Sequence, residues 1–213
     1  MEPLVPLPVV QSIAVNPSVR IINGLNPGPF TMQGTNTVLL NANADASVGI
    51  LIDSGDADTA SIYWEKGLSV AMAESSITEI STVLITHHHH DHVGGISLLR
   101  EKFPSVQVFK RKLLNSDEAC CGSSINEGVE EMARPIEEFK NGGGIETLLT
   151  PGHTKDHISF LIRLPQSTVI LVAGDIILGQ GYSPVFEDLK SFMDSLTFLA
   201  DVCRRENVTI LGN

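Results

Sequence analysis

The sequence predicts an α/β domain in which two sheets pack face to face and helices cover their outer faces. The chain has 213 residues, which is enough for one domain with a sizeable core. Hydrophobic residues make up 42% and charged residues 18%, as in globular proteins rather than disordered ones. Strand and helix patterns follow one another in two successive groups, and this order favours two α/β halves.

The first group of expected elements leads to a run of histidines. Residues 1–17 are rich in proline and are expected to form an extended lead-in to a domain that spans residues 18–213. Three short β patterns follow, at residues 18–22, 37–40 and 49–52. Residues 59–74 have helical spacing, with Trp64, Leu68 and Ala71 or Met72 on one face.

A buried strand is expected at residues 82–86, because its β-branched side chains suit the centre of a sheet. A short helix should follow the histidines, with Val93, Ile96, Leu99 and Phe103 on one face. Another strand is expected at residues 106–109.

The second group begins after an irregular segment. Residues 110–142 contain several glycines and are interpreted as a substrate-side insertion with partial helix. Strands are expected at residues 146–149, 158–164, 168–172 and 208–211. Residues 186–205 form a long amphipathic pattern, and Arg204 and Arg205 suit its carboxyl end electrostatically.

The composition restricts the function. The formal net charge is −11, which argues against a protein that coats nucleic acid, although metal ions would reverse the sign locally. The three cysteines have no disulfide spacing, which favours reduced thiols and an intracellular protein. The adjacent Cys120 and Cys121 are interpreted as a buried pair or a loop pair, and redox chemistry at these two residues is the alternative. The sequence has no membrane-length apolar stretch and no clear signal peptide or mitochondrial presequence.

The run from Thr86 to Asp91-His92 carries the clearest chemistry. Imidazole and carboxylate groups suit zinc, and iron or manganese less well. Residues two apart on an extended segment point the same way, so His87 and His89 can meet one ion. Asp91 and His92, after the chain turns, can face a second ion.

The histidine run also has simpler interpretations. An affinity tag would lie at a terminus, and a solvated loop would not sit between a buried strand and an amphipathic helix. His88 and His90 point the other way and are interpreted as spacers or as groups that support the ligands.

Two later motifs add to the pattern. Gly152-His153 follows the strand expected at residues 146–149, and Gly152 would free the backbone so that His153 can face the site. Gly174-Asp175 follows the strand expected at residues 168–172. Each alone is more often a plain turn, and their order after the histidine run makes them specific.

In this order of motifs the chain resembles the metallo-β-lactamase superfamily. The resemblance implies an αββα four-layer sandwich whose carboxyl-terminal part is missing. It implies two zinc ions, with His87, His89 and His153 on the first, Asp91 and His92 on the second, and Asp175 bridging both. Asp91 would also act in catalysis by orienting the attacking water.

Three segments carry a narrower resemblance, to the family of β-lactamase-like protein 2. They are residues 26–37 (NPGPFTMQGTNT), residues 150–157 (TPGHTKDH) and the stretch after Asp175, with residues 174–181, 185–189 and 193–196. That family is similar to endoribonucleases that cleave single-stranded RNA and are associated with mitochondria. The resemblance therefore implies RNA as substrate and a location in the mitochondrial matrix. A cytoplasmic location is the alternative, and neither a membrane nor an obligate protein partner is expected.

The same segments also resemble thioesterases of fungal polyketide pathways and of the glyoxalase II type. Gln33, Thr35 and Asn36 are candidate substrate contacts, or else a network that stabilises a turn. His157 could donate to the substrate, or else hold Asp91 or His153 in place.

The sequence departs from the superfamily's pattern in one respect: no histidine follows His157, so the superfamily's last ligand is absent. A truncated chain, a shortened gene model or splice form, and a natural variant are the competing explanations. We therefore expect the second zinc site to be weak, and a catalytically impaired binding protein is an alternative function.

Overall fold

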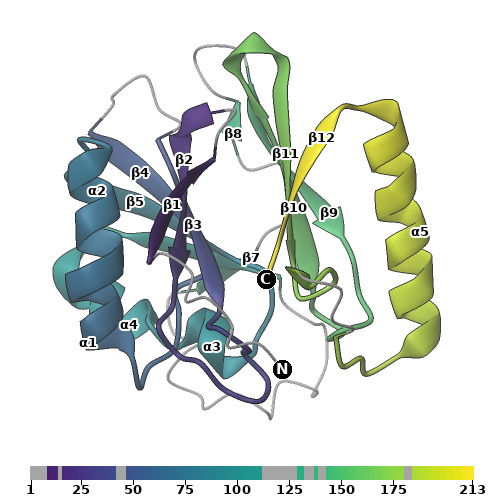
Figure 1. Ribbon diagram of the computed structural model, residues 1–213, viewed down its shortest axis with the longest axis horizontal. Coiled ribbons are helices and arrows are strands. Elements are labelled where there is room, and N and C mark those ends of the chain that lie inside the picture. Colours follow the sequence, from purple (N-terminus) through teal and green to yellow (C-terminus); the bar gives the residue numbers. More distant parts are fainter. Residues whose placement is uncertain are drawn as a thin grey trace, which may run out of the picture.

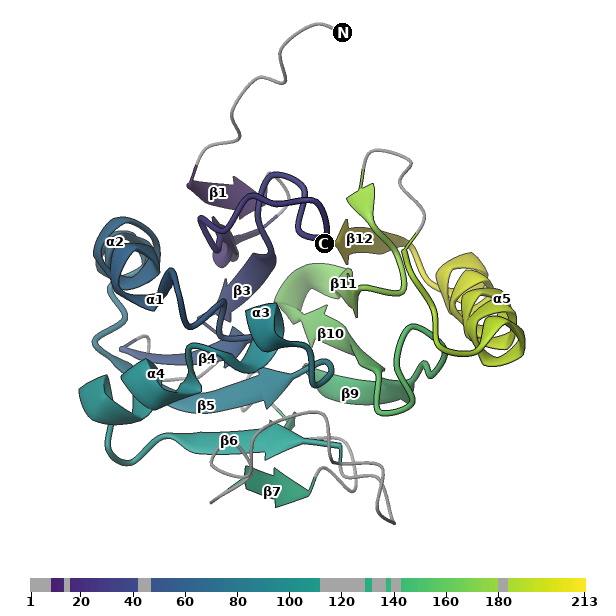
Figure 2. The same cartoon turned by 90° about the horizontal axis from the view of Figure 1, so that it is seen from below.

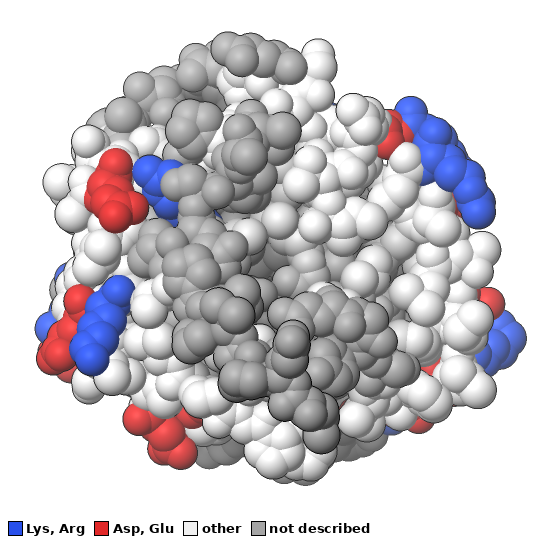
Figure 3. Space-filling view, viewed as in Figure 1, with Lys and Arg blue, Asp and Glu red and all other residues white. Residues whose placement is uncertain are grey.

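The computed structural model describes residues 9–13, 16–41, 47–111, 129–131, 137–138, 143–179 and 184–213. Two sheets face each other, with α1, α2 and α4 outside the first sheet and α5 outside the second (Figure 1; Figure 2). The four-layer αββα prediction is therefore confirmed. On the face shown in Figure 3, charged side chains gather at the two lateral edges, over these outer helices.

The first sheet has seven strands in the order β1-β2-β3-β4-β5-β6-β7. Its strands are β1 (Val10–Ile13), β2 (Asn16–Asn23), β3 (Asn36–Leu40), β4 (Val48–Ile52), β5 (Glu79–Ile85), β6 (Gln107–Lys110) and β7 (Val129–Glu131). Pairing is antiparallel from β1 to β4 and parallel from β4 to β7. The carboxyl ends of β4, β5 and β6 therefore meet at one edge of the sheet.

The helices of this half lie between β4 and β6 in the chain. They are α1 (Ala60–Tyr63), a π-helical turn (Trp64–Leu68), α2 (Ser69–Glu74), α3 (His90–Val93) and α4 (Ile96–Lys102). Together the first three cover the helix predicted at residues 59–74. Its predicted apolar face is also observed, since Leu68, Ala71 and Met72 are buried and Trp64 packs against them.

The second sheet has five strands in the order β12-β11-β10-β9-β8. Its strands are β8 (Glu137–Glu138), β9 (Gly144–Leu149), β10 (Ile158–Leu164), β11 (Thr168–Gly174) and β12 (Val208–Gly212). A short 3-10 turn (Pro165–Ser167) joins β10 to β11, and α5 (Leu189–Arg205) covers the outer face.

Alternation along each strand divides the core between layers. Ile50 and Ile52 of β4 face the second sheet and pack with Phe160 of β10, whereas Leu51 between them packs beneath the outer helices. Successive side chains of a strand point to opposite faces, so a strand buried on both faces must be apolar throughout. This explains why the expected strand patterns are nearly continuous apolar runs.

Two expectations about the chain differ from the structure. The last helix begins at Leu189 instead of residue 186, because the Asp188 side chain accepts a hydrogen bond from the Ser191 backbone N–H and caps the helix there. Within the predicted lead-in, residues 1–17, β1 is extended but is also hydrogen-bonded to β2.

The predicted insertion, residues 110–142, lies largely outside the described residues, as do Cys120 and Cys121. Among the helices that the structure does describe, none is long and apolar enough to cross a membrane.

Candidate metal centre

The loops that leave β5, β9 and β11 bring the predicted ligand residues to one side of the molecule. His87 and His89 follow β5, His153 follows β9, and Asp175 follows β11. The Ile158 backbone N–H donates to the carbonyl of Thr86 over 2.9 Å, and this bond holds the start of β10 against the end of β5. Loops from both sheets that carry ligand candidates therefore lie next to each other.

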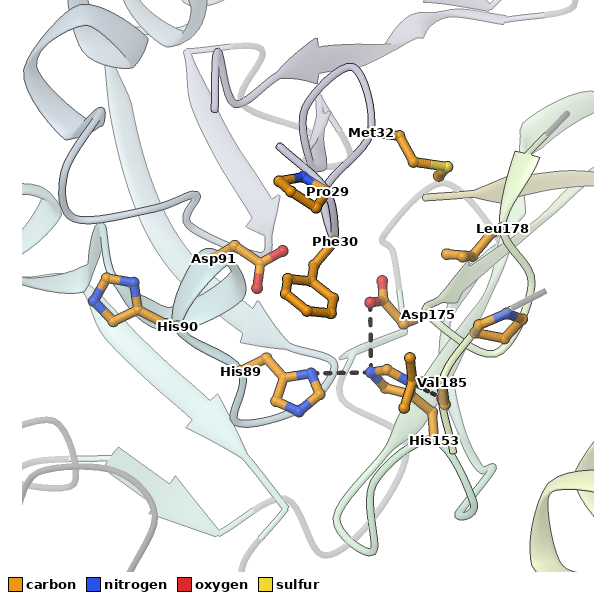
Figure 4. Close-up of a pocket in the computed structure, with 11 residues that line it drawn as sticks. Pro29, Phe30, Met32, His89, His90, Asp91, His153, Asp175, Leu178 and Val185 are labelled. Atoms are coloured by element: carbon orange, nitrogen blue, oxygen red, sulfur yellow. Dashed lines mark hydrogen bonds and ion pairs between the residues drawn. The ribbon is translucent and has the colours of Figure 1, made fainter. Parts of the chain in front are cut away.

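Four side chains converge at this point. The Nδ1 atom of His89 lies 3.0 Å from Nε2 of His87 and 3.0 Å from Nε2 of His153. Asp175 Oδ2 lies 3.4 Å from Nε2 of His153 and 4.0 Å from Nε2 of His87. One ligand atom from each residue thus falls within 4.8 Å of all the others, which is a grouping that can hold a metal ion. Figure 4 shows His89, His153 and Asp175 turned toward one another.

The electrostatic environment suits metal binding. Burial and the neighbouring histidines lower the pKa of His87 well below its usual value and that of His89 to about 4. Both imidazoles are therefore neutral at pH 7 and keep a nitrogen lone pair for a metal. Three imidazoles with one carboxylate are a donor set typical of zinc and other divalent ions. The residues present therefore fit the metal implied by the sequence resemblance.

A second group of ligand candidates lies beside the first. His92 Nε2 is 3.4 Å from Asp91 Oδ2 and 3.3 Å from Asp175 Oδ1. Asp175 thus presents one oxygen to each group, as expected for a bridging carboxylate. Asn213 also reaches this group, because its amide nitrogen donates to Asp175 Oδ1 over 2.6 Å and lies 3.3 Å from His92 Nε2.

Asp91 and His92 differ in how their environment shifts their pKa values. Burial acts to raise the pKa of Asp91, but the nearby His92 and a hydrogen bond from Thr35 outweigh it and lower the pKa to about 2. Burial acts to lower the pKa of His92, but the carboxylates of Asp175 and Asp53 outweigh it and raise the pKa well above its usual value.

Asp53 is a supporting residue that the sequence analysis did not identify. Its buried carboxylate accepts hydrogen bonds from the backbone and hydroxyl of Thr86 and from Nδ1 of His92, which lies at 2.7 Å. The bond fixes the ring of His92 so that Nε2 faces Asp91 and Asp175. Its place directly after β4, which pairs with β5, was the available signal in the sequence.

The even members of the histidine run face away from the ligand groups, as predicted. His88 Nδ1 lies 2.8 Å from Asp156 Oδ1. The side chain of His90 is 61% exposed, lies 3.4 Å from Asp56 and points away from the ligand candidates (Figure 4).

The structure places the four predicted substrate contacts in supporting positions. The Thr35 hydroxyl donates to Asp91 Oδ2 over 2.5 Å, and the Gln33 carbonyl accepts from Asn23. Asn36 bonds through its backbone N–H to Asn213. His157 is fully buried, pairs through Nδ1 with the Thr150 hydroxyl at 2.9 Å and does not line the pocket described next. The fold therefore does not place His157 where its ring could contact a substrate, because this ring lies behind His87.

A cavity of about 520 Å³ opens above the ligand groups. Its polar floor contains His89, Asp91, His153 and Asp175, His90 lies at its edge, and its other lining residues are apolar. The wall residues are Pro29, Phe30, Met32, Leu178, Pro184 and Val185. Phe30 is 86% exposed, and its ring projects between Asp91 and Asp175 (Figure 4). No lysine or arginine lines the cavity among the residues that the structure describes.

Comparisons with known proteins agree with this geometry. Residues 31–117 match the model of the metallo-β-lactamase superfamily. A B. thuringiensis protein with N-decanoyl-L-homoserine bound at its active site has a similar fold, with a TM-score of 0.61 and 18% identity over 84% of this chain and 80% of that one. Residues 31–117 therefore match the metallo-β-lactamase superfamily, and the fold agrees with the resemblance that the motifs predicted.

Two curated relatives are more similar in sequence. A β-lactamase-like protein 2 homologue of Drosophila melanogaster is 37% identical over 188 residues, which are 87% of this chain and 61% of that protein. An atrochrysone carboxyl ACP thioesterase of Passalora fulva is 33% identical over 203 residues, which are 94% of this chain and 54% of that protein. The chain thus spans about half to three fifths of the length of these relatives.

Proposed function

We propose that this protein is a zinc-dependent hydrolase that cleaves single-stranded RNA. The observation that carries the hydrolase assignment is the convergence of His87, His89, His153 and Asp175 at the floor of an open cavity. A divalent ion held by these residues would lower the pKa of a bound water and stabilise negative charge on the attacked group. Zinc is proposed because imidazole and carboxylate donors suit it.

The residues of the second group provide the proton chemistry. Asp91 is ionised at neutral pH, lines the cavity and is held by the Thr35 hydroxyl, so its carboxylate can orient a water molecule and accept its proton. His92 and Asp175 are candidates for a second ion. A weak second site, as expected from the sequence, remains part of this proposal.

Phe30 supports a nucleic-acid substrate. Its exposed ring lies at the rim of the cavity, beside Asp91, where it can stack on a base while the adjacent phosphodiester reaches the polar floor. Stacking of this kind contributes about 1–3 kcal/mol per base and tolerates any base sequence. Similarity to a β-lactamase-like protein 2 homologue is consistent with the RNA hypothesis. A mitochondrial location belongs to the same hypothesis.

A second candidate function, thioester hydrolysis, is favoured by the other walls of the cavity. Met32, Leu178 and Val185 offer apolar contacts to an acyl chain, and the net charge of −11 does not attract a polyanion. Similarity to an ACP thioesterase agrees with this candidate.

One experiment separates the two functions. Zinc-loaded protein is incubated with labelled single-stranded RNA and with acyl thioesters of increasing chain length, with and without a chelator. Asp91→Ala should lower the rate on the true substrate by about 10²- to 10⁴-fold, as expected when a catalytic base is lost. Asp56→Asn, which changes a carboxylate outside the cavity, is the matched control and should retain the rate.

Phe30→Ala adds a test of the substrate. For RNA, the loss of stacking should raise KM by about 5- to 150-fold, while Phe198→Ala, an exposed aromatic on α5, should leave KM unchanged. Thioester turnover without RNA cleavage would replace the leading proposal. RNA cleavage that persists with chelator and in Asp91→Ala would reveal a contaminant, and RNA binding without cleavage would support the binding-protein alternative.

A further inference from the structure

We propose that Asp156 is a positioning residue that holds the two ligand-bearing loops at the separation needed to share a metal ion. One loop carries His87 and His89, and the other carries His153. This inference rests on the metal centre proposed above, and it assigns a role to a buried carboxylate that is not a ligand candidate itself.

The contacts of Asp156 define this role. Its side chain is 2% exposed, and its Oδ1 atom accepts hydrogen bonds from His88 Nδ1 at 2.8 Å and from the Thr154 hydroxyl at 2.7 Å. Its Oδ2 atom lies 3.0 Å from the ammonium of Lys110. Oδ1 therefore accepts two hydrogen bonds, and Oδ2 forms an ion pair without a hydrogen bond.

These partners come from both halves of the fold. His88 lies between the two ligand candidates that follow β5, and Lys110 is the last residue of β6, paired in register with Ile85 of β5. Asp156 and Thr154 lie in the loop between β9 and β10 that carries His153. The carboxylate therefore connects the first sheet to the second. Asp156 itself is three residues from His153 in sequence, and its partner His88 lies between His87 and His89.

The charge arrangement makes this connection firm. A buried carboxylate is costly unless a cation and hydrogen-bond donors compensate it, and Lys110, His88 and Thr154 supply this compensation. They also lower the pKa of Asp156, against the opposing effect of burial, so the group stays ionised. The carboxylate therefore faces His88, Thr154 and Lys110 instead of the ligand candidates.

A second carboxylate–histidine pair in the same run offers a matched comparison. Asp56 lies 3.4 Å from His90, but His90 is 61% exposed and both residues belong to the first half of the fold. Loss of the Asp56 charge removes a similar pair without disconnecting the two loops. Asp56→Asn should therefore leave the metal centre intact.

The test uses cobalt(II) as the metal probe, because its visible absorption reports ligand number and geometry. The full chain and the variants Asp156→Asn and Asp56→Asn are titrated with cobalt, and their thermal unfolding without metal is recorded. Asp156→Asn is expected to lower cobalt affinity by about 10- to 100-fold, the usual effect of losing a group that supports metal ligands. Its absorption band should also change, whereas Asp56→Asn should match the parent in both.

The outcomes are distinguishable. A parent protein that binds no cobalt would overturn the metal-hydrolase proposal and this inference together. If the parent binds cobalt and folded Asp156→Asn shows the same affinity and spectrum, Asp156 serves stability alone and the positioning role is refuted. If Asp156→Asn fails to fold, His88→Gln removes the connection from the partly exposed side, and an unchanged cobalt affinity in that variant would equally refute it.

Discussion

Gly152→Ala tests whether the loop carrying His153 is positioned by close packing against α5. Gly152 has φ +136°, a backbone conformation that is almost confined to glycine. A Cβ atom at this position would lie 2.3 Å from the backbone N and Cα atoms of Phe192. The Gly152 carbonyl also accepts hydrogen bonds from the backbone of Glu187 and Asp188, just before α5.

The expected cost has two parts. Backbone strain at this φ contributes about 1–3 kcal/mol. The contact with helix backbone, which cannot rotate away, adds about 1–3 kcal/mol as overpacking does. The total cost is about 2–6 kcal/mol. Each kcal/mol lowers the melting temperature of a domain of this size by about 2–4 °C. Relief of the clash requires the loop to move, and His153 then leaves His89, from which its Nε2 atom is now 3.0 Å away.

Gly55→Ala is the matched control. Gly55 also has a positive φ, +78°, but a Cβ atom there would approach no closer than 3.7 Å, an ordinary contact with Tyr63. Thermal unfolding and cobalt titration of both variants separate strain from close packing. Equal melting temperatures for the two variants, or parental cobalt affinity in Gly152→Ala, would refute the reasoning.

Three further predictions concern groups around the ligands. Thr35→Val removes the hydrogen-bond donor to Asp91 and should lower kcat by about tenfold, since a hydrogen bond to a charged group contributes about 1.5–3 kcal/mol. The amount of bound metal should not change. Turnover and elemental analysis measure the two quantities, and a loss of metal would contradict the prediction. Asp53→Ala leaves Thr86 and His92 without their acceptor and should destabilise the fold by about 3 kcal/mol or more in denaturant unfolding, whereas a parental midpoint would contradict it. The pKa of Asp156 is lowered on folding, so its charge stabilises the fold above the unfolded value of about 3.9, and this stabilisation is lost as the pH falls further. The stability difference between the parent and Asp156→Asn should therefore be full at pH 7 and shrink below about pH 4; a difference that grows in acid would show the opposite sign.

The sequence was sufficient to predict the layers and most elements because local patterns determine them. Apolar runs such as residues 82–86 and 158–164 are buried on both faces of their sheets, so no partner had to be known to recognise them. The start of the last helix was wrong by three residues because an apolar pattern continues through Phe186. In the structure the Phe186 ring packs near Phe192 from outside the helix, with ring centroids 5.6 Å apart.

The ligand candidates were also accessible from the sequence, since each follows a predicted strand. Their supporting residues were not. Asp53 reaches His92 across 39 positions of sequence, through the parallel pairing of β4 with β5. His157 had two open interpretations, and only the packing of β10 behind His87 shows that this ring is buried.

The histidine run shows why the two kinds of information are both needed. Alternation along an extended segment predicts that His87 and His89 face the site and that His88 and His90 do not. Alternation alone does not determine which pair of the four histidines faces the site, because rotation of the segment about its axis would exchange the two pairs. In the structure, Asp156 and Asp56 contact His88 and His90 from two distant parts of the chain, while Asp53 holds the Thr86 backbone that precedes them. The orientation of the run therefore depends on three carboxylates that only the tertiary structure brings to it.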